Sequence, residues 1–446
     1  MPELSELTAD LLSAAKKAGA DQADAIAVEG ISLSIDIRGG KLETAERSEG
    51  TEIGLRVLIG GRQACVSASD LSPRTIQSLA ERAVAMAQEA PEDPYAGLAD
   101  PDQITKVWDL AALELQDPGA EPGAAQLEEA ARRVEAAAMA TKGITQVEAS
   151  GSYGRRSMHL AATNGFAGGY GRTSHSLSAV AFTGDGVAKE RDWAAEGRIY
   201  LSDMPEAEGI GRLAAERALA RAGAVKPKTG SYPVVFDERV ASSLIGHLLS
   251  AANGAAVARG STWLRDALGQ QVLPKGLSVI EDPLRPRISS SRPFDGEGLA
   301  TARRVIVDDG VLTGWTLDLA TGRKLGMPST ANAVRGVTAP PLPATTNIDL
   351  TPGTASLSDL LSQMGTGLYV TAMLGSTINP TTGDYSRGAS GFWVQNGQIA
   401  YAVNECTIAG NLRDMLMRII PANDARAHLS TRVPSILVEG LTLAGA

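Results

Sequence analysis

A single histidine stands in a segment with the pattern of a helix, "ASSLIGHLLSAANG" (Ala241–Gly254). Helix-borne histidines often bind a catalytic metal ion, but a zinc site needs several ligands and His247 has no second histidine nearby. Ser243 lies one helical turn earlier on the same face, so a serine–histidine hydrolase is one interpretation. That chemistry also needs a group that orients the histidine and an oxyanion site, and neither is visible. We favour the other interpretation, a buried or interface histidine beside a serine that bonds backbone.

Two carboxylates stand close together in a second segment, "RPFDGEG" (Arg292–Gly298). An arginine, a proline and two glycines surround Asp295 and Glu297, which indicates a constrained loop. Such groups can perform acid–base catalysis where a cleft shifts their pKa values. The alternative is that both side chains have a structural role in the loop, and the sequence leaves the two interpretations open.

Other residues that often carry chemistry are scattered. His159 and His175 stand on opposite arms of a predicted hairpin, and His428 lies in a polar segment near the C-terminus. With only Cys65 and Cys406, no disulfide framework is expected, and two unpaired thiols in a reducing compartment are the simpler interpretation. The sequence has no Walker lysine motif, dinucleotide fingerprint, CxxC or GxSxG nucleophile elbow.

Composition predicts a soluble protein without nucleic-acid or membrane partners. The 446 residues carry a net charge of −10 and no run of Lys and Arg, whereas nucleic-acid binding needs a concentrated basic face. The charge-free stretches 240–258 and 360–383 contain many Ser, Asn, Gly or Thr residues, so we expect buried segments and not membrane spans. The N-terminus lacks the basic start and apolar block of a signal peptide. A cytoplasmic location is therefore expected.

The elements that position these residues begin with an amphipathic helix at the N-terminus. Residues 24–70 then give at least three strand-like runs, separated by the turn signals "RGG", "SEG" and "IGG". Ser72 as N-cap and Pro73 at the first helical position predict a helix that follows at once. A further helix is expected at about 124–141, a hairpin turn at "TNG" (Thr163–Gly165), and a helix that ends at Gly223.

The fold class predicted from this pattern is α+β, in two domains. Residues 1–224 form an N-terminal domain of helices and hairpins, with a linker near 91–103 that is rich in Pro and Asp. Residues 225–446 form a β-rich C-terminal domain, and Pro and Gly residues mark the boundary between the two.

Four segments of the C-terminal half are specific enough to compare with known families. They are "IGHLLSAANGAAVARGSTWLRDALGQQVLP", "RPFDGEGLATARRVIVDDGVLTGWTLD", "GDYSRGASGFWVQNGQI" and "TIAGNLRDM". Together they resemble the TldD/PmbA family of metalloproteases, in particular its PmbA (TldE) branch. The N-terminal order of helix, hairpin and helix also fits this family, so the resemblance spans essentially the whole chain.

The resemblance implies a subunit of a heterodimeric zinc metalloprotease that cleaves unfolded or peptide substrates. In this family the TldD-like subunit carries an HExxxH zinc motif, and a cysteine near its C-terminus completes the site. On this chain the second histidine of the motif falls on His247, while Ser242 and Ser243 occupy the places of the first histidine and the glutamate. Hydroxyl groups cannot replace an imidazole ligand and a general base. We therefore expect no metal on this chain and zinc in a TldD-like partner.

Without a zinc site, the chain would contribute the substrate channel and the interface with the catalytic partner. A strand-rich domain can hold an extended peptide through its backbone groups. The candidate residues for this channel or interface are His247, Asp295, Glu297, Asp384 and Ser386.

Two other functions and one other assembly stay open at this point. The chain could be a stand-alone peptide- or protein-binding protein that modulates DNA gyrase or a toxin–antitoxin system. It could also be an independent hydrolase that uses Ser243 and His247. Without its partner it could form a homodimer.

Overall fold

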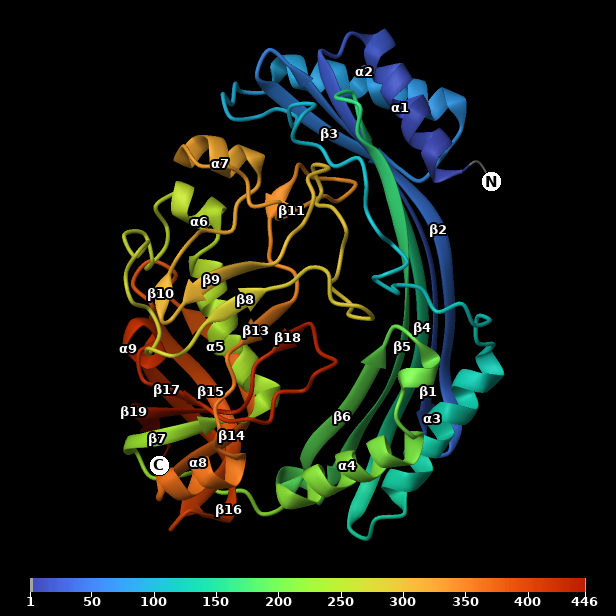
Figure 1. Ribbon diagram of the computed structural model, residues 1–446. Helices are drawn as coiled ribbons and strands as arrows, with labels where there is room; N and C mark the ends of the chain where they lie inside the picture. The colour runs from blue at the N-terminus through green and yellow to red at the C-terminus, as the bar shows by residue number, and fades with distance from the viewer. Residues whose placement is uncertain (1–2, 446) are drawn as a thin grey trace.

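A long antiparallel sheet dominates the N-terminal half of the computed structural model, which describes residues 3–445 apart from the side chains of Val187 and Ser376 (Figure 1). Its six strands follow the order β3-β2-β1-β4-β5-β6. They are β1 (Gln22–Arg38), β2 (Lys41–Ile59), β3 (Arg62–Ala68), β4 (Ile144–Ala162), β5 (Ala167–Thr183) and β6 (Glu190–Arg198).

Four helices cover one face of this sheet. The pair α1 (Leu4–Ala18) and α2 (Pro73–Glu89) covers one end, and the pair α3 (Ala124–Met139) and α4 (Ala207–Ala220) covers the other. Side chains alternate along a strand, so the odd-numbered apolar residues of β1 pack under the helices while the even-numbered ones face the C-terminal half. In Figure 1 the sheet curves along one side of the molecule, and the C-terminal half lies against its hollow face.

The C-terminal half contains a sheet that closes on itself. Its order is β16-β15-β14-β7-β19-β17, and β16 also pairs with β19. The strands are β7 (Gly230–Phe236), β14 (Gly367–Ile378), β15 (Asp384–Gln395), β16 (Gln398–Asn411), β17 (Ile419–Pro421) and β19 (Ile436–Ala444). Helix α5 (Glu238–Ala251) buries Leu244 and Leu248 in the same apolar core.

Shorter elements complete this half. A second sheet has the order β10-β9-β8-β13-β18, and β11 pairs with β12. Their bounds are β8 (Val279–Glu281), β9 (Arg304–Asp308), β10 (Val311–Leu312), β11 (Ala333–Val334), β12 (Leu342–Pro343), β13 (Ile348–Leu350) and β18 (Thr431–Arg432). The helices are α6 (Gly254–Ala258), α7 (Leu319–Leu325), α8 (Leu357–Met364) and α9 (Leu412–Leu416), and 3-10 turns lie at Gly186–Ala188 and Leu201–Asp203.

The α+β class predicted from the sequence is confirmed, and so are several local signals. The Ser72 hydroxyl accepts a hydrogen bond from the Thr75 N–H at 3.3 Å, as expected of the N-cap of α2. The "TNG" turn joins β4 to β5. The division into two domains at residues 224 and 225 stays a prediction. None of the helices between residues 3 and 445 is long and apolar enough to cross a membrane.

The turn predicted at "SEG" is wrong. β2 runs straight through Ser48, Glu49 and Gly50, which pair with Ser32, Ile31 and Gly30 of β1. Gly50 does not adopt a positive φ, so its backbone is that of an ordinary strand residue. It lies directly opposite Gly30, and the exposed, polar middle of β2 gave the misleading signal.

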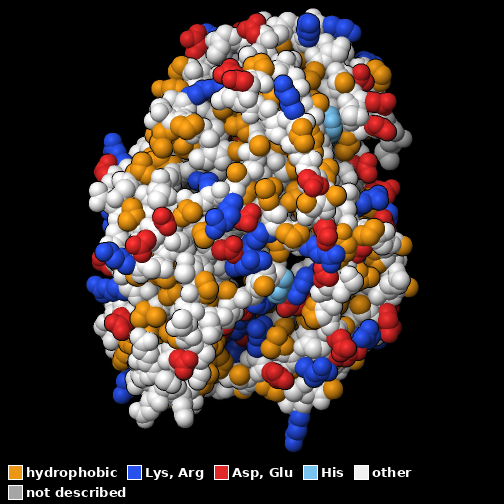
Figure 2. Space-filling view, in the orientation of Figure 1, with side chains coloured by type: hydrophobic (Ala, Val, Ile, Leu, Met, Phe, Trp, Pro, Cys, Tyr) orange, Lys and Arg blue, Asp and Glu red, His pale blue; other side chains and the backbone are white. Residues whose placement is uncertain are grey.

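Ion pairs and a long connection join the two halves. Asp192 of β6 pairs with Arg239 of α5 at 3.0 Å, and Asp24 of β1 pairs with Arg335 at 2.9 Å. Residues 90–123, which include the predicted linker, contain no helix or strand beyond a bridge between Ile104 and Leu299. On the face drawn in Figure 2, basic side chains gather along the hollowed seam between the halves.

Candidate functional site

His247 lies on the side of α5 that faces β15. Its ring meets the edge of the Tyr385 ring, with centroids 6.0 Å apart, and its buried Nε2 has no hydrogen-bond partner among residues 3–445. Burial lowers the pKa of His247, and the positive charge of Arg387 lowers it further. The imidazole is therefore neutral at pH 7.

The neighbours of His247 do not fit a zinc site. The Ser243 hydroxyl donates to the Val240 carbonyl at 2.7 Å and makes no described bond to His247. Within the described part of the chain, no three His, Cys, Asp or Glu side chains are grouped so that they could hold a metal ion. Zinc in proteins takes nitrogen, sulfur and carboxylate ligands in a tetrahedral set, and one imidazole beside the hydroxyls of Ser242 and Ser243 is not such a set. No chemical step is assigned to a metal on this chain.

Asp384 and Ser386 lie on β15, on either side of Tyr385. Because Tyr385 points toward His247, alternation along the strand directs its two neighbours to the opposite face. The exposed Asp384 carboxylate accepts hydrogen bonds from the Thr382 hydroxyl at 2.6 Å and the Asn411 amide at 3.1 Å, and these lower the pKa of Asp384. The fold thus brings β15 beside α5 without directing these two side chains at His247.

Asp295 is buried in the loop between β8 and β9, far along the chain from His247. One carboxylate oxygen accepts the backbone N–H groups of Glu297 and Leu299 at 2.9 and 3.0 Å. The other accepts the Ala333 N–H at 3.1 Å. Burial raises the pKa of Asp295 even though these three N–H groups favour its ionised form. The side chain therefore ties the loop to β11.

Glu297 lies two residues further along the same loop. Its carboxylate accepts the N–H of Leu319, the first residue of α7, at 2.8 Å. Burial and the nearby negative charge of Asp295 raise the pKa of Glu297 well above its ordinary value. Asp295 and Glu297 thus lie close together, as predicted, and their observed hydrogen bonds are to backbone N–H groups that hold the loop in place.

A cavity of about 940 Å³ lies between the hollow face of the long sheet and this loop. Its floor comes from the even-numbered residues of β1, with their neighbours on β2, β4 and β5. Its opposite wall comes from two segments of the C-terminal half, 292–296 and 333–335. Asp295, with its bonds to Ala333, joins the two segments of that wall.

Arginines from both halves line this cavity. Arg156 and Arg172 are direct neighbours on β4 and β5, and Arg292 stands on the opposite wall. Burial lowers the pKa of Arg172, and the positive charges of Arg156 and Arg292 lower it further. Arg335 also lines the cavity, but its charge is taken up by Asp24.

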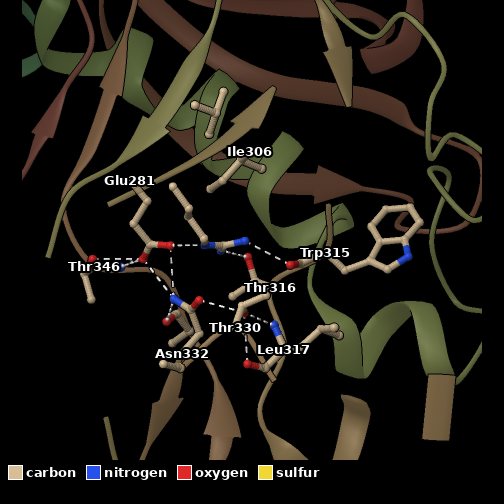
Figure 3. A network of polar contacts seen from close by, with 12 residues as sticks. Glu281, Ile306, Trp315, Thr316, Leu317, Thr330, Asn332 and Thr346 are labelled. Carbon is tan, nitrogen blue, oxygen red and sulfur yellow. Dashed lines mark hydrogen bonds and ion pairs between the residues drawn. The ribbon is translucent and has the colours of Figure 1, made fainter. Parts of the chain in front are cut away.

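A buried polar network surrounds Glu281 (Figure 3). Glu281, 2% exposed, pairs with Arg304 at 2.6 Å and accepts hydrogen bonds from Asn332 at 2.9 Å and from the Thr346 hydroxyl at 2.9 Å. Arg304 also donates to the Trp315 carbonyl and the Thr316 hydroxyl. Asn332 directly precedes the wall segment 333–335, so the network fixes the place where that segment starts.

Sequence reasoning found part of this site. It selected Asp295 and Glu297, which lie at or beside the cavity, but it missed Arg156, Arg172 and the network around Glu281. The signals were present only as isolated residues, because Arg156 and Arg172 become neighbours through strand pairing and Glu281 meets Asn332 across 51 positions. Arg292 belongs to the same motif as Asp295 and Glu297, but the sequence pattern assigns it no role.

The other histidines and the cysteines lie elsewhere. His159 Nδ1 is 2.8 Å from the Thr8 hydroxyl, and His175 pairs with Asp117 at 3.3 Å. They stand on β4 and β5 as predicted, but at different places along the hairpin, since His159 is opposite Gly169. His428 lies 3.1 Å from Glu196. Both cysteines are free, and burial raises the pKa of Cys406 to about 11.

Models of known protein families match most of the chain. Residues 23–87 match the model described as PmbA/TldA metallopeptidase domain 1. Residues 117–222 match the central domain, and residues 229–445 match the C-terminal domain of the same family. The cavity is lined by residues from all three matched segments.

Individual relatives agree with these matches. The chain is 37% identical to the metalloprotease PmbA of Escherichia coli O157:H7 over 415 residues, which are 93% of this chain and 90% of that protein. A Bacteroides thetaiotaomicron protein described as a candidate modulator of DNA gyrase has a structure with a TM-score of 0.91 and 27% identity, covering 99% of this chain and 98% of that one. TldE from Thermococcus kodakarensis shares the fold, with a TM-score of 0.85 at 18% identity and coverage of 98% and 100%. The chain therefore belongs to the PmbA/TldA metallopeptidase family.

Proposed function

We propose that this chain is the PmbA/TldE-like subunit of a two-subunit metalloprotease, and that a TldD-like partner holds the catalytic zinc. The complex cleaves unfolded or peptide substrates, and this chain supplies part of the substrate channel and of the interface. The chain alone cleaves nothing.

One observation carries the proposal. The chain belongs to a metallopeptidase family, yet the place where the HExxxH motif falls offers His247 beside two hydroxyl groups, and no three potential zinc ligands are grouped among the described residues. A peptidase of this kind needs zinc to activate water and polarise the scissile carbonyl. The proposed partner therefore supplies the whole zinc site, and His247 is not one of its ligands.

The experiment that tests this function compares three samples in one cleavage assay. Reduced and alkylated casein is incubated with the chain alone, with a TldD-like protein from the same genome alone, and with both together. We expect cleavage with both proteins only, its loss with a zinc chelator, and elution of the two proteins as one complex. Chelator-resistant cleavage by the chain alone, abolished in Ser243→Ala, would establish the independent hydrolase instead.

A further inference from the structure

We propose that the arginine-lined cavity binds the carboxylate of a short extended peptide, with Arg156, Arg172 and Arg292 as the groups that recognise it. This proposal rests on the function proposed above, since it names the chemical feature by which this chain holds peptides. The carboxylate can come from the end of a chain or from an acidic side chain.

These arginines form no ion pair within the described part of the protein, although Asp295 in the same wall acts electrostatically on Arg292. No carboxylate lies within 4.0 Å of Arg156, Arg172 or Arg292 in the described residues, whereas Arg335 beside them pairs with Asp24. Arg172 donates to the Ser291 carbonyl and Arg292 to the carbonyls of Ala333 and Ala344, which are neutral acceptors. Arg172 and Arg292 are largely withdrawn from water without an ion-pair partner, which is unfavourable, so an anion that enters here gains more than at a fully exposed site.

Unused donors point to the same ligand. Arg292 is only 7% exposed, and its Nε–H has no acceptor among residues 3–445. The Nε–H of Arg172 likewise lacks an acceptor in the described part of the chain. Buried donors are nearly always bonded in native proteins, and the guanidinium fork matches the two oxygens of a carboxylate.

The floor of the cavity has the shape that a peptide backbone requires. Four residues form one row across the sheet: Gly50 on β2, Gly30 on β1, Arg156 on β4 and Arg172 on β5. A Cβ atom at Gly50 would meet nothing within 4 Å, and one at Gly30 would meet only the Arg155 carbonyl at 3.9 Å. The two glycines thus leave a flat, open path from the outer strand to the arginines, about 14 Å long at one strand spacing per step. Roughly four extended residues span it.

The outer end of this path is the edge of β2, where backbone groups face solvent and can pair with an added strand. β2 pairs with β3 only from Ile53 onward, so residues 41–52 have a partner strand on one side only in the described structure. Ser48 and Glu52 line the cavity from this edge. Glu52 makes the edge acidic and the arginines make the inner end basic, so a carboxylate is favoured at the inner end over the edge.

The test measures peptide binding to the chain alone, by fluorescence anisotropy, so that it is independent of proteolysis and of any partner. The probe is fluorescein-Gly-Ser-Gly-Ala-Ala-Ala with a free C-terminus. Its C-terminal amide is the uncharged comparison, and an amide with one Ala replaced by Glu carries the carboxylate on a side chain. We expect one or both carboxylate peptides to bind at least 10-fold more tightly than the uncharged amide, and which one does identifies the source. Equal binding of all three would overturn the proposal.

Two variants place the binding in the cavity. Arg156→Gln removes an exposed charge without a described bond, and Gly50→Val fills the path without altering an arginine. Each should weaken binding at least 10-fold, while Arg74→Gln, an exposed charge on the outer helix α2, should leave it unchanged. Unchanged binding in both cavity variants would overturn the proposal, as would complete displacement of the peptide by an equal concentration of inorganic phosphate. Either failure leaves the cleavage assay with the partner unaffected, so the two proposals are judged separately.

Discussion

At the scale of single residues, Glu281 shows how a buried charge can organise a site that it does not enter. One carboxylate oxygen of Glu281 pairs with Arg304, and both accept hydrogen bonds from Asn332. These bonds fix the position of the backbone next to the cavity wall. Such a network is stable because each member has its partners. Removing one of them leaves a buried donor or acceptor of its neighbours without that partner.

We predict that Glu281→Gln lowers the free energy of unfolding by about 3–5 kcal/mol, because it leaves the largely buried Arg304 without a counter-charge. Urea unfolding followed by circular dichroism measures this. Glu43→Gln is the matched control, since Glu43 pairs with Arg38 at the surface and its loss should change stability by no more than about 1 kcal/mol. Equal effects of the two substitutions would contradict the assigned role of Glu281.

Glu297 gives a prediction about pH. Its pKa is raised in the folded protein, so the unfolded chain releases this proton at lower pH than the folded chain does. The contribution of Glu297 to wild-type stability should therefore fall as the pH rises from about 4.3 through the folded pKa, by about 1.4 kcal/mol for each pH unit of that interval. Glu297→Gln keeps the acceptor for Leu319 and loses this decline.

The measurement is urea unfolding of both proteins between pH 4 and pH 8. The variant should equal the wild type near pH 4 and exceed it at pH 8. Glu46→Gln, at an exposed position of β2, should follow the wild type throughout. A Glu297→Gln curve parallel to the wild-type curve would refute the raised pKa.

At the scale of elements, β2 explains both what the sequence predicts and what it does not. Local signals act within a few residues, so the Ser72 N-cap and the "TNG" hairpin were predicted correctly. At "SEG" the residue types favour a turn, but β1, which is seventeen residues long, pairs with β2 on both sides of this segment and keeps it extended. The floor of the cavity depends on this long-range pairing, which is why its arginines could not be assigned from spacing. The loop residues Asp295 and Glu297 could be assigned from the sequence, because both stand in one short motif, "RPFDGEG".

The contact of β1 with the C-terminal half yields a prediction for a whole element. Burial alone would raise the pKa of Asp24, but the charges of Arg56 and Arg335 outweigh it and hold that pKa below its ordinary value. Asp24→Asn should therefore destabilise the protein by about 3–5 kcal/mol, since it leaves two buried guanidinium groups without their partner.

Hydrogen exchange can locate this effect. We expect faster exchange in the segment around Arg335 and in the paired ends of β1 and β2, with α8 unchanged. Asp10→Asn, on the exposed face of α1, serves as the control. Uniform acceleration over the whole chain would show that Asp24 has no special role in joining the two halves.

At the scale of the whole molecule, the two halves are combined so that neither holds a complete site. The long sheet supplies Arg156 and Arg172, the C-terminal half supplies Arg292 and Asp295, and His247 stands apart on α5. This arrangement suits a subunit that holds a peptide for chemistry performed by another chain. In the part of the chain that the structure describes, no three potential ligands are grouped to hold a metal ion, so family membership alone assigns no metal centre there.

The most direct measurement is the zinc content of the chain purified alone and of the complex with a TldD-like partner, both after dialysis against trace zinc. The proposed division of roles predicts fewer than about 0.1 zinc ions per chain for the protein alone and close to one per complex. His247→Ala should leave the content of the complex unchanged. Near one zinc ion on the isolated chain, lost in His247→Ala, would contradict the account and make this chain a metalloenzyme in its own right.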